Sequence, residues 1–199
     1  MRKIILILFF FGGLFLGHSQ KFDTMSDADK ENFKIKAIEK IKLLGFTFDK
    51  IATSRNIEDK NRIIESILPS FVLKPEQATI EVASRKGKND YPIETYLREK
   101  LKNYKKRYAV VDIDFVSFDI KDLRPHRTEP NSYYMEYTIV QKFCGSKLGN
   151  RNKEGLLQYD YCDYTTKKGS FLIKKVNTIL GSKWKMLYES IYVVDIKIL

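Results

Sequence analysis

The chain has 199 residues, of which 43% are hydrophobic and 31% are charged, and its formal net charge is +11. This length and composition fit a single globular domain with its own core and exclude an intrinsically disordered chain. The sequence contains no GxSxG, HExxH, P-loop or GxGxxG motif. Serine hydrolases, zinc proteases and nucleotide-binding proteins of the usual kinds are therefore excluded.

The first residues have the three-part layout of a secretory signal peptide. Arg2 and Lys3 form a basic start, residues 4–16 are an unbroken apolar or glycine run, and Gly17-His18-Ser19 supplies small residues before a cleavage point. The apolar run is shorter than the roughly 20 residues that a membrane-spanning helix needs. We therefore expect a signal peptide at 1–19 and a periplasmic or extracellular protein without a membrane span.

Two helices are expected at the start of the mature domain, which comprises residues 20–199. Between Ser26 and Ser54 the apolar residues recur in steps of three and four, which predicts one long helix with Ser26 as its N-terminal cap. Asn56 caps a second helix, and Pro69 ends it because proline offers no backbone N–H to the helical ladder.

A short strand and a third helix are expected next. Residues 78–84 alternate between apolar and polar side chains, as a strand does, and the polar residues 85–90 (RKGKND) are interpreted as a loop. Pro92 then begins a helix that presents one apolar face. That face consists of Ile93, Leu97, Leu101 and Tyr104.

From Tyr108 onward the apolar period changes to two, which predicts long strands. The expected strands are 108–120 with a β-bulge near Phe115–Val116, 132–144, 156 to about 176 with a turn or bulge at 167–169, and 183 to about 196. Helices that precede strands predict an α+β fold. We expect the N-terminal helices to pack in the concave face of a curved antiparallel sheet.

The order of these elements resembles that of the nuclear transport factor 2-like superfamily. The stretches that carry the resemblance are YPIETYLREKL (91–101), YAVVDIDFVSF (108–118), SYYMEYTIVQKF (132–143) and KWKMLYESIY (183–192). The resemblance covers residues 27–196 and rests on element order and pattern. It implies a cone-like domain, with a pocket at the open end in many members. Other folds with cystatin-like topology are the alternatives, and no catalytic residue of the superfamily maps onto this sequence.

Cys144 and Cys162, the only cysteines, are predicted to form a disulfide. Both occupy even, more polar positions of two strands that should pair across the loop at 145–155. In an exported protein, two thiols on one face of neighbouring strands most simply form a bridge. Two unlinked thiols are the main alternative. A zinc pair or a catalytic cysteine would each depend on His126, the only histidine of the mature chain.

A mainly aromatic stripe, on odd positions of the two strands that carry the cysteines and on even positions of the last strand, is the candidate pocket lining. It consists of Tyr133, Met135, Tyr137, Ile139, Tyr159, Tyr161, Trp184 and Tyr188. Such a stripe also serves as ordinary core, although buried tyrosine hydroxyls need hydrogen-bond partners. Among the carboxylates, Asp112 with Asp114, and Asp160 with Asp163, could divide acid and base roles or simply form the wet face of a sheet.

These observations favour an exported, non-enzymatic module of the cell envelope that binds a small-molecule ligand or a protein. The alternative is a small-molecule isomerase or dehydratase that uses polar residues in the cone pocket; a deeply buried Asp or Glu facing the tyrosines would favour it. We expect no cofactor, no metal and no nucleic-acid partner, because the Lys-rich segments 86–88 and 100–107 suit a solvated loop and a helix end. A homodimer through the outer sheet face is a further expectation.

Overall fold

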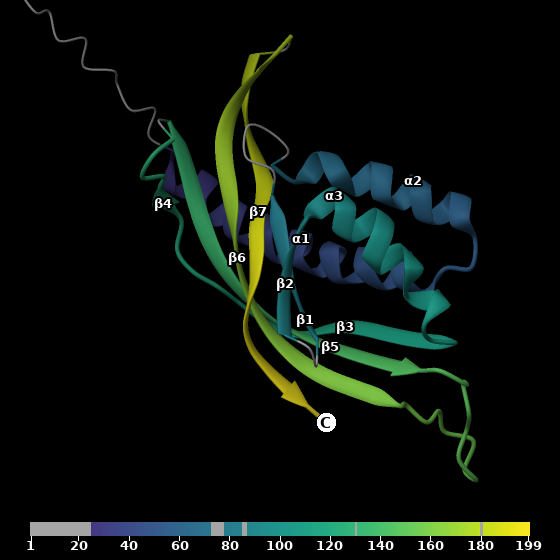
Figure 1. Ribbon diagram of the computed structural model, residues 1–199. Helices are drawn as coiled ribbons and strands as arrows, with labels where there is room; N and C mark the ends of the chain where they lie inside the picture. Colours follow the sequence, from purple (N-terminus) through teal and green to yellow (C-terminus); the bar gives the residue numbers. More distant parts are fainter. Residues whose placement is uncertain (1–24, 73–77, 85–86, 130, 180) are drawn as a thin grey trace, which may run out of the picture.

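The computed structural model describes residues 25–72, 78–84, 87–129, 131–179 and 181–199 (Figure 1). The predicted signal peptide lies outside these residues. Within them, no helix is both long and apolar enough to cross a membrane. The chain has an α+β fold in which helices from the N-terminal half lie in the concave face of a curved sheet (Figure 1).

The helices begin where the capping signals predict. The helical elements are α1 (Asp27–Thr53), α2 (Ile57–Ile67), the 3₁₀ turn η1 (Leu68–Ser70), and a third segment made of α3 (Ile93–Thr95), η2 (Tyr96–Lys100) and η3 (Leu101–Lys106). The Ser26 hydroxyl accepts the backbone N–H of Asp29 at 3.1 Å. The Asn56 side-chain carbonyl accepts the N–H of Glu58 at 2.8 Å. Both predicted N-terminal caps are confirmed.

The third helical segment is irregular, whereas the sequence predicts an ordinary helix after Pro92. One α-helical turn is followed by a π-helical turn and then by 3₁₀ geometry. Tyr96 and Leu97, at the start of the π-helical turn, are both buried.

In the part of the chain that the structure describes, seven strands form one mixed sheet in the order β2-β1-β7-β6-β5-β3, with β4 paired to β5. The strands are β1 (Thr79–Ser84), β2 (Gly87–Pro92), β3 (Val110–Ile120), β4 (Arg124–Pro125), β5 (Ser132–Ser146), β6 (Tyr161–Thr178) and β7 (Gly181–Ile198). All pairs are antiparallel except β1 with β7. The expected antiparallel sheet is corrected in this one respect, because β1 joins the long strands in parallel through Ile80 and Ile191.

Two of the sequence predictions for the strands are wrong. The predicted loop at 85–90 is wrong for residues 87–90, which belong to the edge strand β2, and its first two residues lie outside the described residues. The polar composition of β2 reflects its exposed position, and pairing with β1 supplies its hydrogen bonds. The strand predicted from residue 156 begins only at Tyr161. In the preceding segment the Asn152 side chain accepts the N–H of Leu156 at 2.9 Å, which favours a turn over a strand.

The predicted bulges are confirmed and explain the bend of the sheet. The pairing of β3 with β5 shifts register between Phe115 and Ser117, and that of β6 with β7 shifts around 166–171. At the first bulge, Phe115 packs on Gly45 of α1, where a Cβ atom would lie 2.9 Å from the Phe115 ring. The glycine that weakens α1 locally therefore allows the helix to approach the bent strand.

Candidate functional site

The two cysteines form the predicted disulfide and join the strands that carry the candidate site. Cys144 of β5 lies directly opposite Cys162 of β6. Their neighbours Phe143, Tyr161 and Asp163 line a cavity on the concave face of the sheet. Because side chains alternate along a strand, the bridge lies behind the cavity wall and holds its two strands in register.

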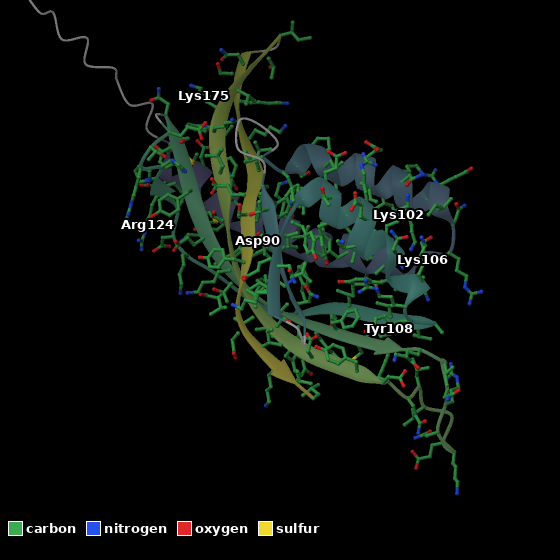
Figure 2. All side chains as sticks on the ribbon, in the orientation of Figure 1. Asp90, Lys102, Lys106, Tyr108, Arg124 and Lys175 are labelled. Carbon is green, nitrogen blue, oxygen red and sulfur yellow. A yellow bond between two sulfur atoms is a disulfide. The ribbon has the colours of Figure 1, made fainter. Side chains whose placement is uncertain are left out.

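The cavity has a volume of about 320 Å³ and lies between the sheet and the third helical segment. Its floor comes from β5 and β6, its roof from Tyr96 and Tyr104, and its side from Val82 and Ala83 of β1. Tyr108, whose position is labelled in Figure 2, lines the cavity near the start of β3 and the end of β5. This volume is at the lower end of the range for small-molecule pockets.

The floor on β6 is polar and deeply buried. Asp163, Thr165 and Lys167 occupy alternate positions, so that their side chains point to the same face, and none is more than 7% exposed. The Thr165 hydroxyl donates to Asp163 at 2.8 Å, which fixes that carboxylate. Three buried polar side chains in a row interrupt a face that is otherwise apolar.

Lys167 is the most unusual group in the cavity. Its burial lowers the pKa to about 8, and the carboxylates of Asp163 and Glu81 oppose this shift only in part. Within the described residues, no carboxylate approaches Lys167 closely enough to form an ion pair. Because this pKa lies above 7, the amine is mostly protonated at neutral pH. The cavity therefore holds a buried positive charge for which the described residues supply no ion-pair partner.

Gln141 of β5 adds an unsatisfied acceptor to the same floor. It lies directly opposite Thr165 in the sheet and is 7% exposed. Its side-chain carbonyl has no hydrogen-bond partner among the described residues. Buried polar atoms are nearly always paired. Because Gln141 lines the cavity, a rotation of its side chain would present this unpaired oxygen to a donor there.

Aromatic rings cluster around Phe143, which lies on β5 two residues from Gln141. The ring centroids of Tyr104, Tyr108 and Tyr161 lie 5.5, 5.7 and 6.0 Å from that of Phe143. Gly145 makes this packing possible, because a Cβ atom there would lie 2.6 Å from the Tyr108 ring. The Tyr104 hydroxyl is protonated at neutral pH and can donate a hydrogen bond. Burial raises its pKa further above the ordinary value of 10.0.

Charged residues surround the cavity at its outer rim. Arg107, Lys147 and Asp160 all line it. The Asp160 carboxylate accepts the backbone N–H of Lys147 at 2.5 Å, which ties the start of β6 to the end of β5. Together with Lys167 and the buried Asp163, the lining carries three cationic side chains and two carboxylates. The remaining excess of one positive charge favours an anionic ligand.

The predicted pocket residues occupy several different places. Tyr133, Met135, Tyr137, Ile139 and Tyr188 are buried in the core. The hydroxyls of Tyr133 and Tyr188 bond to backbone atoms of Met25 and Lys40. Tyr161 lines the cavity, and Trp184 lines a separate groove near the β6–β7 hairpin. Tyr159 precedes β6 and is 38% exposed, because the strand begins later than the sequence predicts.

The acidic candidates also separate. Asp160 and Asp163 both line the cavity. Asp112 and Asp114 lie instead in a groove between α1 and β3 with Asp49, whose pKa is raised mainly by burial. Asp112 also faces Lys142 at 3.7 Å. Of the two pairs, only Asp160 with Asp163 contributes to the cavity.

His126 lies outside the cavity but is more ordered than its sequence context suggests. Its Nδ1 accepts the N–H of Glu129 at 3.0 Å, and its Nε2 lies 3.8 Å from the Glu189 carboxylate. Glu189 in turn accepts the Ser170 hydroxyl at 2.6 Å. The loop histidine is thus held against β7 rather than freely solvated.

Sequence reasoning missed Lys167, Thr165 and Gln141 as site residues. The signal was a break in the apolar alternation: Gln141 interrupts the apolar odd positions of β5, and the odd positions of β6 become polar between Tyr161 and Phe171. Polar residues on the concave face of two adjacent strands indicate an unfilled space there. No protein-family model and no curated protein matches this chain.

Proposed function

We propose that this protein is an exported binding module that holds a small anionic molecule in the cavity between the sheet and the third helical segment. The observation that carries this proposal is the buried Lys167, which lacks an ion-pair partner among the described residues and shares a floor with the unpaired carbonyl of Gln141. A buried charge costs free energy unless it is paired, and a bound anion would supply the missing partner.

The cavity lining indicates the chemistry of the ligand. A carboxylate or similar anion would pair with Lys167, and a hydroxyl or N–H group of the ligand would donate to Gln141. The rings around Phe143 offer a flat apolar surface for the rest of the molecule. A small aromatic or unsaturated acid with a hydroxyl or amide group meets these requirements within about 320 Å³.

Binding of phenylacetate and of the uncharged 2-phenylethanol tests the proposal. We expect wild-type protein to bind phenylacetate better, as measured by saturation-transfer NMR and by titration calorimetry. Lys167→Met should lose this preference, because the buried cation is gone. Lys168→Met is the matched control, since Lys168 is the next residue but exposed. Equal binding of the two probes, or equal losses in both variants, would exclude an anion site at Lys167.

A second function, that of an isomerase or dehydratase, is favoured by the buried Asp163 near an amine with a pKa of about 8. An amine with this pKa can act as a general base near neutral pH. It would remove a proton from the carbon next to a carbonyl and return it to the same or a neighbouring position. Deuterium exchange at the α-carbon of phenylpyruvate in D₂O, compared with Lys167→Met and with buffer alone, tests this. Exchange at the buffer rate would leave binding as the function.

We also propose membership of the nuclear transport factor 2-like superfamily. The order of helices and strands, the β1–β2 hairpin before the third helical segment, and the helices in the concave face support it. Export is supported by the leader sequence and by the disulfide, which is typical of oxidising compartments. Mass spectrometry of the protein recovered from the periplasm or medium should show Gln20 as the first residue.

We also propose a homodimer through the outer sheet face, independently of the cavity function. Tyr192 of β7 is 51% exposed there and lies opposite the exposed Lys168. Light scattering at two concentrations measures the association directly. A monomeric mass at both concentrations would remove the dimer and leave the proposed cavity function intact.

A further inference from the structure

We propose that the end of the molecule opposite the cavity docks onto an anionic lipid surface. This basic end is defined by Lys36 and Lys40 of α1, Ile179 at the tip of the β6–β7 hairpin, and Lys183, Trp184 and Lys185 at the start of β7. Lys167 and Thr178 are eleven residues apart along β6, which corresponds to roughly 35 Å of extended chain. The basic end is therefore separate from the proposed ligand site.

The hairpin projects beyond the helical layer, as Figure 1 shows. Ile179 at its tip is fully exposed. The tip is held in shape by the Thr178 hydroxyl, which donates to the carbonyl of Gly181 at 2.6 Å, and by the Ser182 hydroxyl, which donates to Asn177 at 2.8 Å. A large apolar side chain that a hairpin presents to water is suited to shallow insertion among lipid headgroups.

A groove next to this hairpin combines apolar and basic side chains. Lys36 and Lys40 line it from α1, and Lys183 and Lys185 line it from β7, whereas Glu39 is the one acidic residue among its described lining. Trp184 also lines the groove, and its ring packs edge-on against Tyr133 with centroids 5.5 Å apart. Tryptophan beside lysines is the combination that favours a membrane–water interface.

The lysines of the basic end repel one another. Lys185 lies directly opposite Lys174 across the β6–β7 pair, an arrangement that is unfavourable for like charges. The pKa of Lys40 is lowered by burial and then by the charge of Lys185. Glu129 lies 3.6 Å from Lys174 and offsets part of this repulsion. An anionic surface would relieve the remaining repulsion among these lysines. The proposal depends on this charge complementarity.

A lipid surface fits these features better than an acidic peptide does. A peptide in the groove would contact the lysines and Trp184, but it would leave the projecting Ile179 in water. A planar surface that carries negative headgroups over an apolar layer contacts the lysines and the hairpin tip together. Ile179 therefore distinguishes the two partners experimentally.

Co-sedimentation with vesicles tests the proposal. We expect the exported protein to bind vesicles of phosphatidylcholine with added phosphatidylglycerol and to bind phosphatidylcholine alone weakly. Lys183→Gln/Lys185→Gln should weaken binding by about 25-fold, since each lysine near an anionic membrane contributes about fivefold. Ile179→Glu should weaken it as well. All variants carry the same N-terminus, so any vesicle binding that it adds is equal in all of them and does not affect the comparison.

The matched control is Lys102→Gln/Lys106→Gln, which changes the net charge equally on the third helical segment. Figure 2 shows these lysines on the helical layer, away from Lys175 of the hairpin. We expect this control to bind as the wild type does. Equal weakening of the two double variants, or no binding to anionic vesicles, would overturn the proposal.

Two further readouts identify the partner. Trp184 is the only tryptophan of the chain, so a blue shift of its emission on addition of anionic vesicles is expected if the basic end makes the contact. Vesicle binding without this shift would overturn the proposal. If Ile179→Glu binds vesicles as well as the wild type and poly-glutamate competes for binding, the partner is an acidic protein and not a lipid surface. If inorganic phosphate competes for binding, the basic end is a small-anion site.

Discussion

The cavity and the basic end both carry lysines, but in opposite physical settings. Lys167 is buried on the floor of the cavity, where its pKa is lowered to about 8. Lys183 and Lys185 are exposed beside the hairpin, where water solvates them. A buried charge is costly and therefore suits selective recognition of one small partner, whereas exposed charges cost little and suit a broad, salt-sensitive attraction.

The largest effect that we expect is a gain of stability when the buried charge is removed. Lys167→Met should raise the free energy of unfolding by as much as about 3 kcal/mol at pH 7. The native state loses the Lys167 proton near pH 8, whereas the unfolded chain keeps it up to its ordinary value of 10.5. The free energy of unfolding of the wild type therefore rises between pH 8 and pH 10.5. Above pH 10.5 the extra stability of Lys167→Met should disappear.

Urea unfolding of both proteins at pH 7 and above pH 10 measures this difference. Lys168→Met is the control, and we expect it to match the wild type at both values, because an exposed lysine has little to gain from substitution. An equal stability of Lys167→Met and wild type at pH 7 would contradict the burial of an uncompensated charge.

A loss of similar size is expected when the disulfide is removed. Cys144→Ala/Cys162→Ala should lower the free energy of unfolding by about 3 kcal/mol, because the bridge closes a loop of 18 residues. The cavity should suffer more than the basic end, since Phe143 and Asp163 flank the bridge. We expect weaker phenylacetate binding and unchanged vesicle binding in the same preparation. Equal loss of both would show that the bridge stabilises the whole domain rather than one end.

Gly145→Ala should destabilise the aromatic wall by about 2 kcal/mol, because the new methyl group would meet the Tyr108 ring. Tyr108→Ala in the same chain removes the clash. The double variant should therefore be less destabilised than the sum of the two single variants. Thermal and urea unfolding of the wild type, the two single variants and the double variant completes this cycle. Strictly additive losses of stability would show that the effect of Gly145→Ala does not come from its contact with Tyr108.

The smallest effect is expected at the hairpin tip. Ile179→Glu should change the free energy of unfolding by less than about 0.5 kcal/mol, because the side chain is fully exposed. Circular dichroism during thermal unfolding measures this. A clear loss of stability would mean that Ile179 contributes to folding, and its effect on vesicle binding would then need a surface-neutral substitution such as Ile179→Ser.

Local patterns predicted the elements whose signals lie within a few residues. The stripe of α1, the caps at Ser26 and Asn56 and the bulge near Phe115 follow from side-chain period and hydrogen-bonding chemistry. The disulfide followed from parity, because both cysteines fall on one face of neighbouring strands. The strand β2 was missed, since polar edge strands resemble loops until a partner strand is placed beside them.

The candidate site was only partly predictable for a related reason. The stripe on β5 and β6 showed which side chains share the concave face, but not which of them the helices cover. The concave face around Tyr137 and Phe171 is filled by the hydrophobic core, whereas a space remains between the third helical segment and Gln141 and Lys167. The extent of this cover depends on the winding of 93–106, which the sequence pattern does not reveal.

The sequence by itself determined the class of fold, the helix caps, the bend of the sheet and the pairing of the cysteines, because each follows from chemistry between near neighbours or from strand parity. Only the tertiary structure decided that Tyr159 lies outside, that β1 runs parallel to β7, and that Asp163, Lys167 and Gln141 share one cavity. These features depend on how distant segments cover one another, and burial, rather than residue type, sets the pKa of Lys167.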